Sequence, residues 1–401
     1  ANIDNFAIYS GVDATSDVIP VITANVPEIV AVSQTKDSLF PITADVSYLG
    51  GGVSWSSDNA GVTVDGGFLR VAAGTAPGNV KLTATSVYDA GVTADYTVTV
   101  TSAYEAATAD SNIGISAAGR ILLTGKVSGS GTVTFAGNDT LAVDIPQCDD
   151  AELIVYINSF DNSYEAYANR QEIAKGTTNL SILSSVSLSG VSLTDAYVGS
   201  LTEILPLPVN VKIDGIVAGD QNVKAVWEVF SPCGTEATSS AVAWSLSATE
   251  TGAQTPLGNK VNQKIDNDKV GQYLTLSVTL TSAGGATRTV LPAALIRTIL
   301  SVSKTNGGVA LDILNPYGDT TLVPFVLLYK DGKITDVQAV KIKTADTDIH
   351  RELSITESYD GLAAFVLDEK FAAVTGVVSM GSVPNLYQTA AGSGLSIEGD
   401  K

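Results

Sequence analysis

The chain has few of the residue types that most often carry enzyme chemistry. Its 401 residues include one histidine, one methionine and two cysteines. A Ser-His-Asp set would need His350, which lies in a charged stretch, and the chain contains no G-x-S-x-G sequence. The glycine patterns of phosphate-binding and dinucleotide-binding loops are also absent. We therefore expect a protein that is not an enzyme and that holds no organic cofactor.

Basic residues and long apolar runs are scarce as well. Only 22 lysines and arginines stand against 42 acidic residues, which gives a formal net charge of −20. This balance disfavours nucleic acid and anionic membrane surfaces as partners, because their phosphates would be repelled. No run of about 18 apolar residues is present, so we expect no membrane span. Because the chain begins Ala1-Asn2-Ile3, we interpret it as a mature extracellular form from which a signal peptide has been removed.

The two cysteines leave two alternatives open. Cys148 and Cys233 are a disulfide candidate, since an even pair is common in secreted chains. They are equally consistent with two buried thiols. A zinc site is disfavoured, because the two cysteines and the one histidine lack any metal-binding spacing.

What the sequence has in abundance indicates strands. Valine, threonine, serine, alanine and glycine dominate, and 37 glycines with 13 prolines predict frequent turns. The fold class predicted is all-β, as tandem immunoglobulin-like β-sandwich domains. The length suits three or four of them.

One stretch carries the clearest motif. Val53-Ser54-Trp55-Ser56-Ser57-Asp58-Asn59 is followed by Val62-Thr63-Val64, Gly66-Gly67, Gly74 and a strand-like run from Val80 to Thr85. These residues resemble the bacterial immunoglobulin-like domain of group 2, over residues 27–103. The spacing departs from that pattern at Ala76-Pro77-Gly78-Asn79, where a few extra residues lengthen a loop. The resemblance implies a module of cell-surface and secreted proteins.

A weaker echo of the same pattern lies in residues 206–298. Val242-Ala243-Trp244-Ser245 parallels the strand around Trp55, and Tyr273 to Thr279 parallels the run from Val80. Trp55 and Trp244 are expected in the cores of their sandwiches, where such folds bury a large ring. Trp227 is the freer tryptophan and the candidate for stacking on a carbohydrate.

The remaining residues predict two further β domains. Residues 104–205 contain four short apolar runs, a linker at Ser102 to Ser111, a helix-favouring stretch at Tyr164 to Ala174, and a serine-rich tract with strand alternation. Residues 299–401 contain the hairpin signal Asp331-Gly332 between two apolar runs and end in a tail of small residues.

The N-terminal segment, residues 1–26, is apolar for a chain end. Phe6, Ile8, Val18, Ile19 and Val21 make it a candidate donor strand that completes the sheet of a neighbouring copy. The alternative is that this strand pairs within its own domain.

Short acidic clusters are the candidates for cation binding. Asp266-Asn267-Asp268 is the best of them for calcium, with Asp149-Asp150 and Asp346-Thr347-Asp348 behind it. Solvated acidic loops explain the same residues. None follows the EF-hand pattern.

These observations favour a structural subunit of an extracellular prokaryotic surface assembly, either an S-layer lattice or a filament. Its partners would be copies of itself and cell-wall polysaccharide. The alternative function is a cell-surface adhesin or a carbohydrate-binding module, whose recognition would lie in loops at one end of a sandwich.

Overall fold

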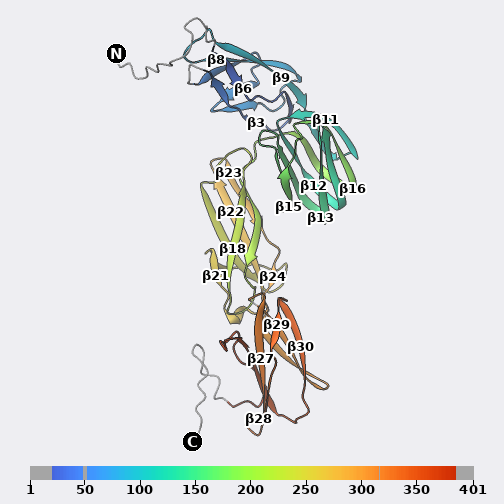
Figure 1. The fold of residues 1–401 in the computed structure, drawn as a ribbon, viewed down its shortest axis with the longest axis vertical. Coiled ribbons are helices and arrows are strands. Elements are labelled where there is room, and N and C mark those ends of the chain that lie inside the picture. The colour runs from blue at the N-terminus through green and yellow to red at the C-terminus, as the bar shows by residue number, and fades with distance from the viewer. Residues whose placement is uncertain (1–19, 48–51, 316, 385–401) are drawn as a thin grey trace, which may run out of the picture. The chain divides into compact units, whose positions relative to one another are not determined.

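A computed structural model describes residues 20–47, 52–315 and 317–384. Apart from one short 3-10 helix, η1 (Asn267–Lys269), every regular element in these ranges is a β-strand. The fold is all-β: small sheets are paired into immunoglobulin-like sandwiches in three modules, and one module is a single larger curved sheet (Figure 1). Among the described residues no helix is long and apolar enough to cross a membrane.

The chain divides into two compact units. The first comprises Ala1–Val211, Trp227–Ser240 and Thr279–Thr289, and the second comprises Lys212–Val226, Ala241–Val278 and Val290–Lys401. The division passes through the third module, because several of its strands have residues in both units.

The first module is a sandwich of two sheets around one core. Its four-stranded sheet has the order β2-β9-β8-β5 and its three-stranded sheet the order β3-β7-β6. The fully buried side chains alternate along the strands, as the sequence pattern requires for a half-buried sheet. A two-stranded pair, β1 and β4, lies beside the sandwich. The strands are β1 (Ile22–Ala24), β2 (Ile29–Val32), β3 (Ser38–Pro41), β4 (Ala44–Val46), β5 (Val53–Ser57), β6 (Val62–Asp65), β7 (Phe68–Val71), β8 (Gly78–Ser86) and β9 (Thr93–Ser102).

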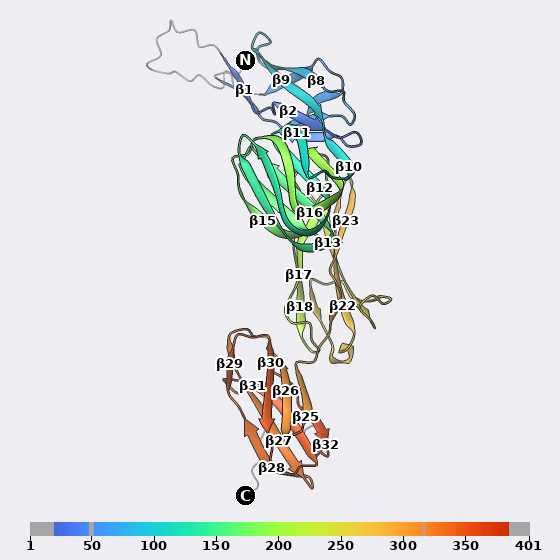
Figure 2. The same cartoon turned by 90° about the vertical axis from the view of Figure 1, so that its right-hand side faces the viewer.

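The second module is one curved seven-stranded sheet with the order β10-β16-β12-β13-β14-β15, and β11 pairs with β16 (Figure 2). Ile121 and Phe135, at opposite ends of β12, share one buried core, so the sheet curls around its own apolar face. The strands are β10 (Tyr104–Thr108), β11 (Asn112–Ala118), β12 (Arg120–Gly137), β13 (Thr140–Asn158), β14 (Ser163–Ala168), β15 (Gln171–Thr177) and β16 (Ile182–Ser200).

Three sequence expectations for this module were wrong. The four apolar runs form two strands of 18 and 19 residues, because bulges around Gly129 bend them without ending them. The expected linker at residues 102–111 contains β10, which pairs with β16. The expected helix at Tyr164 to Ala174 is the hairpin of β14 and β15, where pairing with β13 overrides local helix propensity. The serine-rich tract is a strand, β16, as predicted.

The segment Ser200–Val209 binds together the parts of the first unit. The Ser200 hydroxyl accepts a hydrogen bond from the buried Ala31 N–H at 2.9 Å, and the Leu201 carbonyl accepts one from Leu39 N–H at 3.0 Å. Further along, the Pro208 carbonyl accepts a hydrogen bond from the Thr289 hydroxyl at 2.6 Å. A buried cluster then joins this segment to the outer face of the curved sheet through Leu122, Ile154, Tyr156, Tyr167, Leu201, Leu207, Val209, Phe230 and Cys233.

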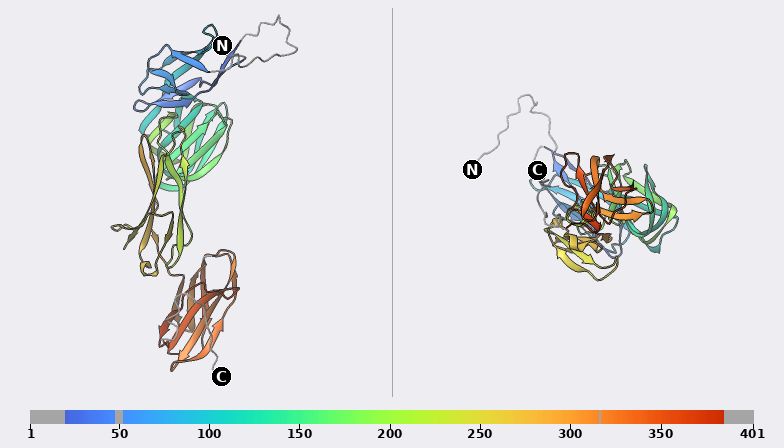
Figure 3. Two further views of the ribbon diagram at one scale, coloured as in Figure 1. Left: turned by 90° about the vertical axis from the view of Figure 1, so that its left-hand side faces the viewer. Right: turned by 90° about the horizontal axis from the view of Figure 1, so that it is seen from below.

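The third and fourth modules share the order of their main strands and differ in one added short strand. In the third, the sheets have the orders β17-β18-β21 and β20-β19-β22-β23, with β24 on β22. In the fourth, which is coloured orange to red in Figure 3, they are β25-β26-β30 and β28-β27-β31-β32, with β29 on β27. The third module contains β17 (Leu207–Asp214), β18 (Asn222–Phe230), β19 (Ser239–Ser247), β20 (Thr255–Gly258), β21 (Asn262–Lys264), β22 (Tyr273–Ser282), β23 (Gly285–Val290) and β24 (Ala294–Leu295). The fourth contains β25 (Leu300–Thr305), β26 (Gly308–Leu314), β27 (Thr320–Lys330), β28 (Lys333–Ala339), β29 (Ile342–Thr344), β30 (Asp348–Ser354), β31 (Gly361–Asp368) and β32 (Val378–Gly381).

Local sequence signals are reproduced in both modules. The hairpin predicted at Asp331-Gly332 is confirmed, with φ of 51° and 74° at the two turn residues, as a two-residue turn of this type requires. The strand that carries Trp244 pairs with β22, just as the strand that carries Trp55 pairs with β8.

The bend of β12 generates a stability prediction. A methyl group at Gly131 would overlap the Ser189 carbonyl oxygen of the paired strand, whereas one at Gly114 would meet no atom within 4 Å. We expect Gly131→Ala to lower the free energy of unfolding by about 1–3 kcal/mol. Gly114→Ala is the matched control and should change it by no more than about 0.5 kcal/mol. Urea denaturation monitored by circular dichroism checks both. Equal effects of the two variants would contradict the close approach at Gly131.

Candidate interaction groove

The candidate site is a groove in the first sandwich, between the last strand of each sheet. Among the described strands, β5 pairs only with β8 and β6 pairs only with β7, so each strand is the edge of its sheet. Residues 58–61 connect the two strands directly. β4, which pairs with β1, contributes Ala44 to the groove, but no described strand pairs with β5 or β6 across the gap between the sheets.

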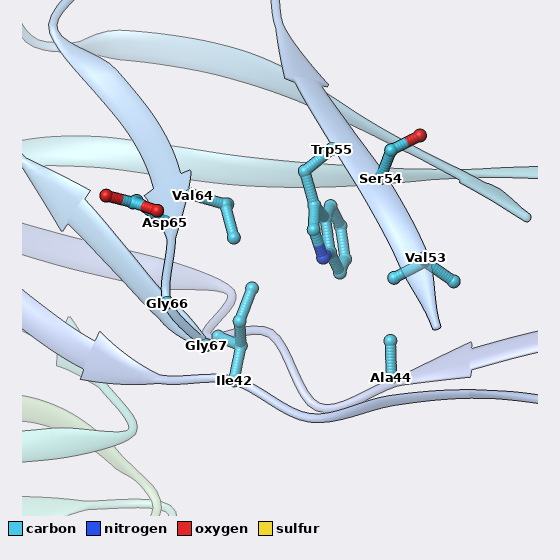
Figure 4. Close-up of a pocket in the computed structure, with 9 residues that line it drawn as sticks. All are labelled: Ile42, Ala44, Val53, Ser54, Trp55, Val64, Asp65, Gly66 and Gly67. Atoms are coloured by element: carbon cyan, nitrogen blue, oxygen red, sulfur yellow. The ribbon is translucent and has the colours of Figure 1, made fainter. Parts of the chain in front are cut away.

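The groove contains a cavity of about 330 Å³, whose accessible lining is mainly polar although apolar side chains also face it. The side chains of Ile42, Ala44, Val53 and Val64 point into it, whereas the Ser54 hydroxyl points away (Figure 4) and donates a hydrogen bond to the Thr85 carbonyl. Its lining comprises Ile42, Ala44, Val53, Ser54, Trp55, Val64, Asp65, Gly66 and Gly67. The site can therefore take apolar side chains from an extended chain or one face of a small ligand.

Trp55 forms the inner wall of the groove and is only partly buried. Its ring packs against Tyr96, with ring centroids 5.7 Å apart and an angle of 49° between the planes. The Tyr96 hydroxyl donates a hydrogen bond to the Ile22 carbonyl at 3.3 Å. Trp244, by contrast, is 1% exposed, and its indole N–H donates to the Lys260 carbonyl at 2.7 Å. Trp55 and Trp244, which were both expected in a core, thus have different environments. Trp227 is half-buried, as Trp55 is.

The floor of the groove depends on a tight turn. Asp65 and Phe68 are paired residues, and the two glycines between them have φ of 56° and 82°. Side chains other than glycine rarely adopt these angles. The Gly67 carbonyl accepts a hydrogen bond from Ile42 N–H at 2.8 Å, which fixes Ile42 beneath the cavity.

The sequence predicted Trp55 as a core residue and Gly66-Gly67 as part of a motif, and it did not predict Ile42, Ala44 and Val64 as a site. Alternation shows that such residues face inward, yet it does not show that a strand is an edge. The available signal was the short connection between β5 and β6, because residues 58–61 are too few to contain another strand.

The donor-strand candidates lie mostly outside the described residues. Phe6, Ile8, Val18 and Ile19 fall in the part of the chain before residue 20. Val21 is described and is 57% exposed, and its N–H and carbonyl both hydrogen-bond with Ser47 of its own module. The following residues form β1, which pairs with β4. Residues 20–26 therefore belong to the first sandwich and not to a separate segment.

The structure does not bring the two cysteines together, so the disulfide alternative is corrected to two free thiols. Cys148 lies at the bulge of β13 and packs against the core of the curved sheet. Cys233 is buried in the cluster on the outer face of that sheet, where its thiol donates to the Thr202 carbonyl at 3.3 Å. Burial raises the pKa of Cys233, so the thiol is kept protonated.

The calcium candidate does not form a cage of oxygen atoms. Asp266 and Asp268 flank the start of η1, and each is paired with a different lysine: Asp266 with Lys264 at 3.3 Å and Asp268 with Lys269 at 2.6 Å. Asn267 lies between them in the turn. In the described ranges no group of three or more His, Cys, Asp or Glu side chains could hold a metal ion.

His350 lies on β30 opposite Asp312 of β26, and its Nδ1 is 2.7 Å from the Asp312 carboxylate. The hydroxyl of Ser301 contacts the same carboxylate and not the imidazole, so these three residues lack the serine-to-histidine contact of a nucleophilic triad. His350 and Asp312 therefore form an exposed pair across two neighbouring strands.

Comparisons with known proteins add little to this description. No protein-family model matches the chain, and no curated protein matches it. Among solved structures, it is similar to domains A168–A170 of titin, with 12% sequence identity and a TM-score of 0.18 over 69% of this chain and 99% of that one. A TM-score of this size carries no argument, and the fold assignment rests on the strand pairing given above.

The histidine pair generates a pH prediction. The hydrogen bond to Asp312 raises the pKa of His350 above its ordinary value of 6.5. The pair therefore stabilises the fold fully below about pH 6.5, and this contribution is lost as the pH rises through the raised pKa. Because the chain has one histidine, its ring gives a single set of imidazole signals in a proton NMR titration. We expect an apparent pKa above 6.5 that Asp312→Asn lowers towards that value. An unshifted titration in the parent chain would contradict the pair.

Proposed function

We propose that the chain is a structural subunit of an extracellular prokaryotic surface assembly, an S-layer lattice or a filament, built by self-association. The observation that carries this proposal is the groove between β5 and β6. An extended segment that entered it would find free backbone groups on an edge strand and a cavity for its alternate side chains.

The proposed occupant is the N-terminal segment of a neighbouring copy. Phe6 and Ile8 are spaced two residues apart, so in an extended chain both side chains face the same way. Val18 and Ile19 provide further apolar side chains, whereas β1 is already paired with β4 of its own module. The donor residues would therefore be those that precede β1.

The packing inside the first unit supports a structural role. A buried cluster and backbone hydrogen bonds join its parts through Ser200–Val209, where a flexible linker would have none. A subunit of a lattice or filament benefits from this rigidity, because each copy then holds its contact surfaces at fixed positions.

The family and location form part of the proposal. We infer that the first module is a bacterial immunoglobulin-like domain of group 2, since its tryptophan strand, its glycine turn and its β8 run follow that pattern. Such a module suits the cell surface, where copies of the chain and cell-wall polysaccharide would be its partners.

An adhesin or carbohydrate-binding module is the second candidate. One observation favours it: the partly buried Trp55 ring lines a cavity whose accessible surface is mainly polar. Sugars stack on aromatic rings and hydrogen-bond to polar groups, so a glycan end could occupy the groove.

Filling the groove tests the proposal. Ala44→Phe places a ring in the cavity, and we expect it to abolish self-association of the purified full chain, measured by light scattering over time. The matched control is Ala243→Phe, which adds the same ring at an exposed position of β19 and should leave association unchanged. Deletion of residues 1–19 should act like Ala44→Phe, and a peptide of residues 1–19 added in excess should slow assembly of the parent chain.

Two results would count against the proposal. If Ala44→Phe assembled as the parent does, the groove would not be the contact. If the parent chain bound an immobilised glycan and Ala44→Phe did not, while neither associated, the second candidate would replace the first.

A further inference from the structure

The outer face of one sheet in the fourth module is apolar. β27 presents Val323, Phe325 and Leu327 on the side opposite its core residues, and their partners on β31 are Leu367, Phe365 and Ala363. Of these six, Ala363 is buried and the other five are partly exposed. Phe325 and Phe365 stack with ring centroids 5.2 Å apart and planes 9° from parallel. Val337 of β28, which is paired with Leu327, is 51% exposed. We call these residues the β27–β31 face.

The other sandwiches are different at the corresponding positions. In the first module, β8 presents Lys81, Thr83 and Thr85 on the side opposite its core residues. In the third, β22 has Thr275, Ser277 and Thr279 at the positions that alternate with its apolar core, and the first two of these side chains are themselves buried. The first module shows the polar version of such a face, which solubility favours. The apolar face of the fourth module therefore indicates an interaction surface.

The charges at the edges of the β27–β31 face indicate what covers it. Lys343 of β29 is paired with Thr321 of β27. On the other side of β27, Leu322 is paired with Asp368, and Glu369 is the next residue. The lysine and the glutamate therefore lie at about the same level along the strands, on opposite sides of β27, and both are exposed. In the described part of the chain neither forms an ion pair.

We propose that the β27–β31 face packs against the same face of a second copy of this chain. A two-fold axis parallel to the strands keeps each residue at its level and exchanges the two edges of the sheet. At the usual spacing of about 10 Å between packed sheets, the Phe325 and Phe365 stacks of the two copies come into contact. The same rotation brings Lys343 of each copy towards Glu369 of the other, so the contact is complementary in charge as well as apolar.

This contact deepens the proposed function and rests on it for its biological role, since it names a second surface for self-association. It uses a different module from the groove, so the two can fail separately. Ala44→Phe, which fills the groove, is expected to leave this dimer intact, whereas changes in the β27–β31 face should leave the groove able to bind a peptide of residues 1–19.

Sedimentation velocity of the full chain over a range of concentrations tests the contact, with Ala44→Phe as background so that larger assemblies do not form. We expect a monomer–dimer equilibrium whose Kd rises by about tenfold or more in Phe325→Ser with Phe365→Ser. The matched control is Tyr88→Ser, which removes an aromatic side chain that is 71% exposed in the first module and should leave the Kd unchanged.

Charge exchange provides a test that does not alter the apolar residues. Lys343→Glu should weaken the dimer, and adding Glu369→Lys to the same chain should restore it, because the pair is rebuilt across the axis with reversed signs. The effect should shrink at high salt.

Three outcomes would overturn the inference. The chain could remain monomeric at every concentration. The double serine variant could dimerise as its parent does. Finally, a dimer could form only after deletion of residues 385–401, which would mean that this segment, and not a second copy, covers the face.

Discussion

The structure of the first unit depends on the packing of Ser200–Val209. This short segment follows the longest strands of the curved sheet, supplies hydrogen-bond acceptors to the first sandwich and to Thr289, and contributes Leu201, Leu207 and Val209 to a buried apolar cluster. Further contacts between the same parts are the hydrogen bonds of Arg120 with the Pro232 carbonyl and of Arg170 with the Arg288 carbonyl. Burial of the side chains around Ser200–Val209 joins the parts of the first unit at close-packed contacts.

Two surfaces of the sandwiches remain open, one in each unit. Most edges and faces of the sandwiches are protected by threonine, serine and charged side chains, which is how β-proteins avoid unwanted pairing. The groove beside Trp55 and the face around Phe325 depart from this protection in opposite ways. The first is an open edge with a cavity that suits an inserted chain, and the second is a flat apolar face that suits another flat face. The groove contact is heterologous and can build a filament by itself, whereas the isologous contact of the β27–β31 face closes into a dimer. Together the two contacts would link filaments side by side.

Much of the fold could be predicted from the sequence, because its signals are local. Three signals depend only on neighbours within a few residues. They are the alternation along β8 and β9, the turn at Asp331-Gly332 and the similar residues around Trp55 and Trp244. The failures lie where distant pairing decides. Tyr164 to Ala174 contains good helix formers, yet the free edge of β13 draws it into a hairpin. The bends of β12 and β13 come from bulges, which the alternation of apolar residues does not reveal. Cys148 and Cys233 lie apart because they pack on opposite faces of the curved sheet. The groove could not be predicted for the same reason, because an edge strand is defined by the absence of a neighbour.

Electron microscopy of the purified full chain over a range of concentrations tests the central claim most directly. A subunit with an accepting groove and an apolar dimer face should form filaments or sheets with a regular repeat and without added ligand. Monodisperse single particles at every concentration would contradict the structural role and leave recognition of a glycan as the function of the groove.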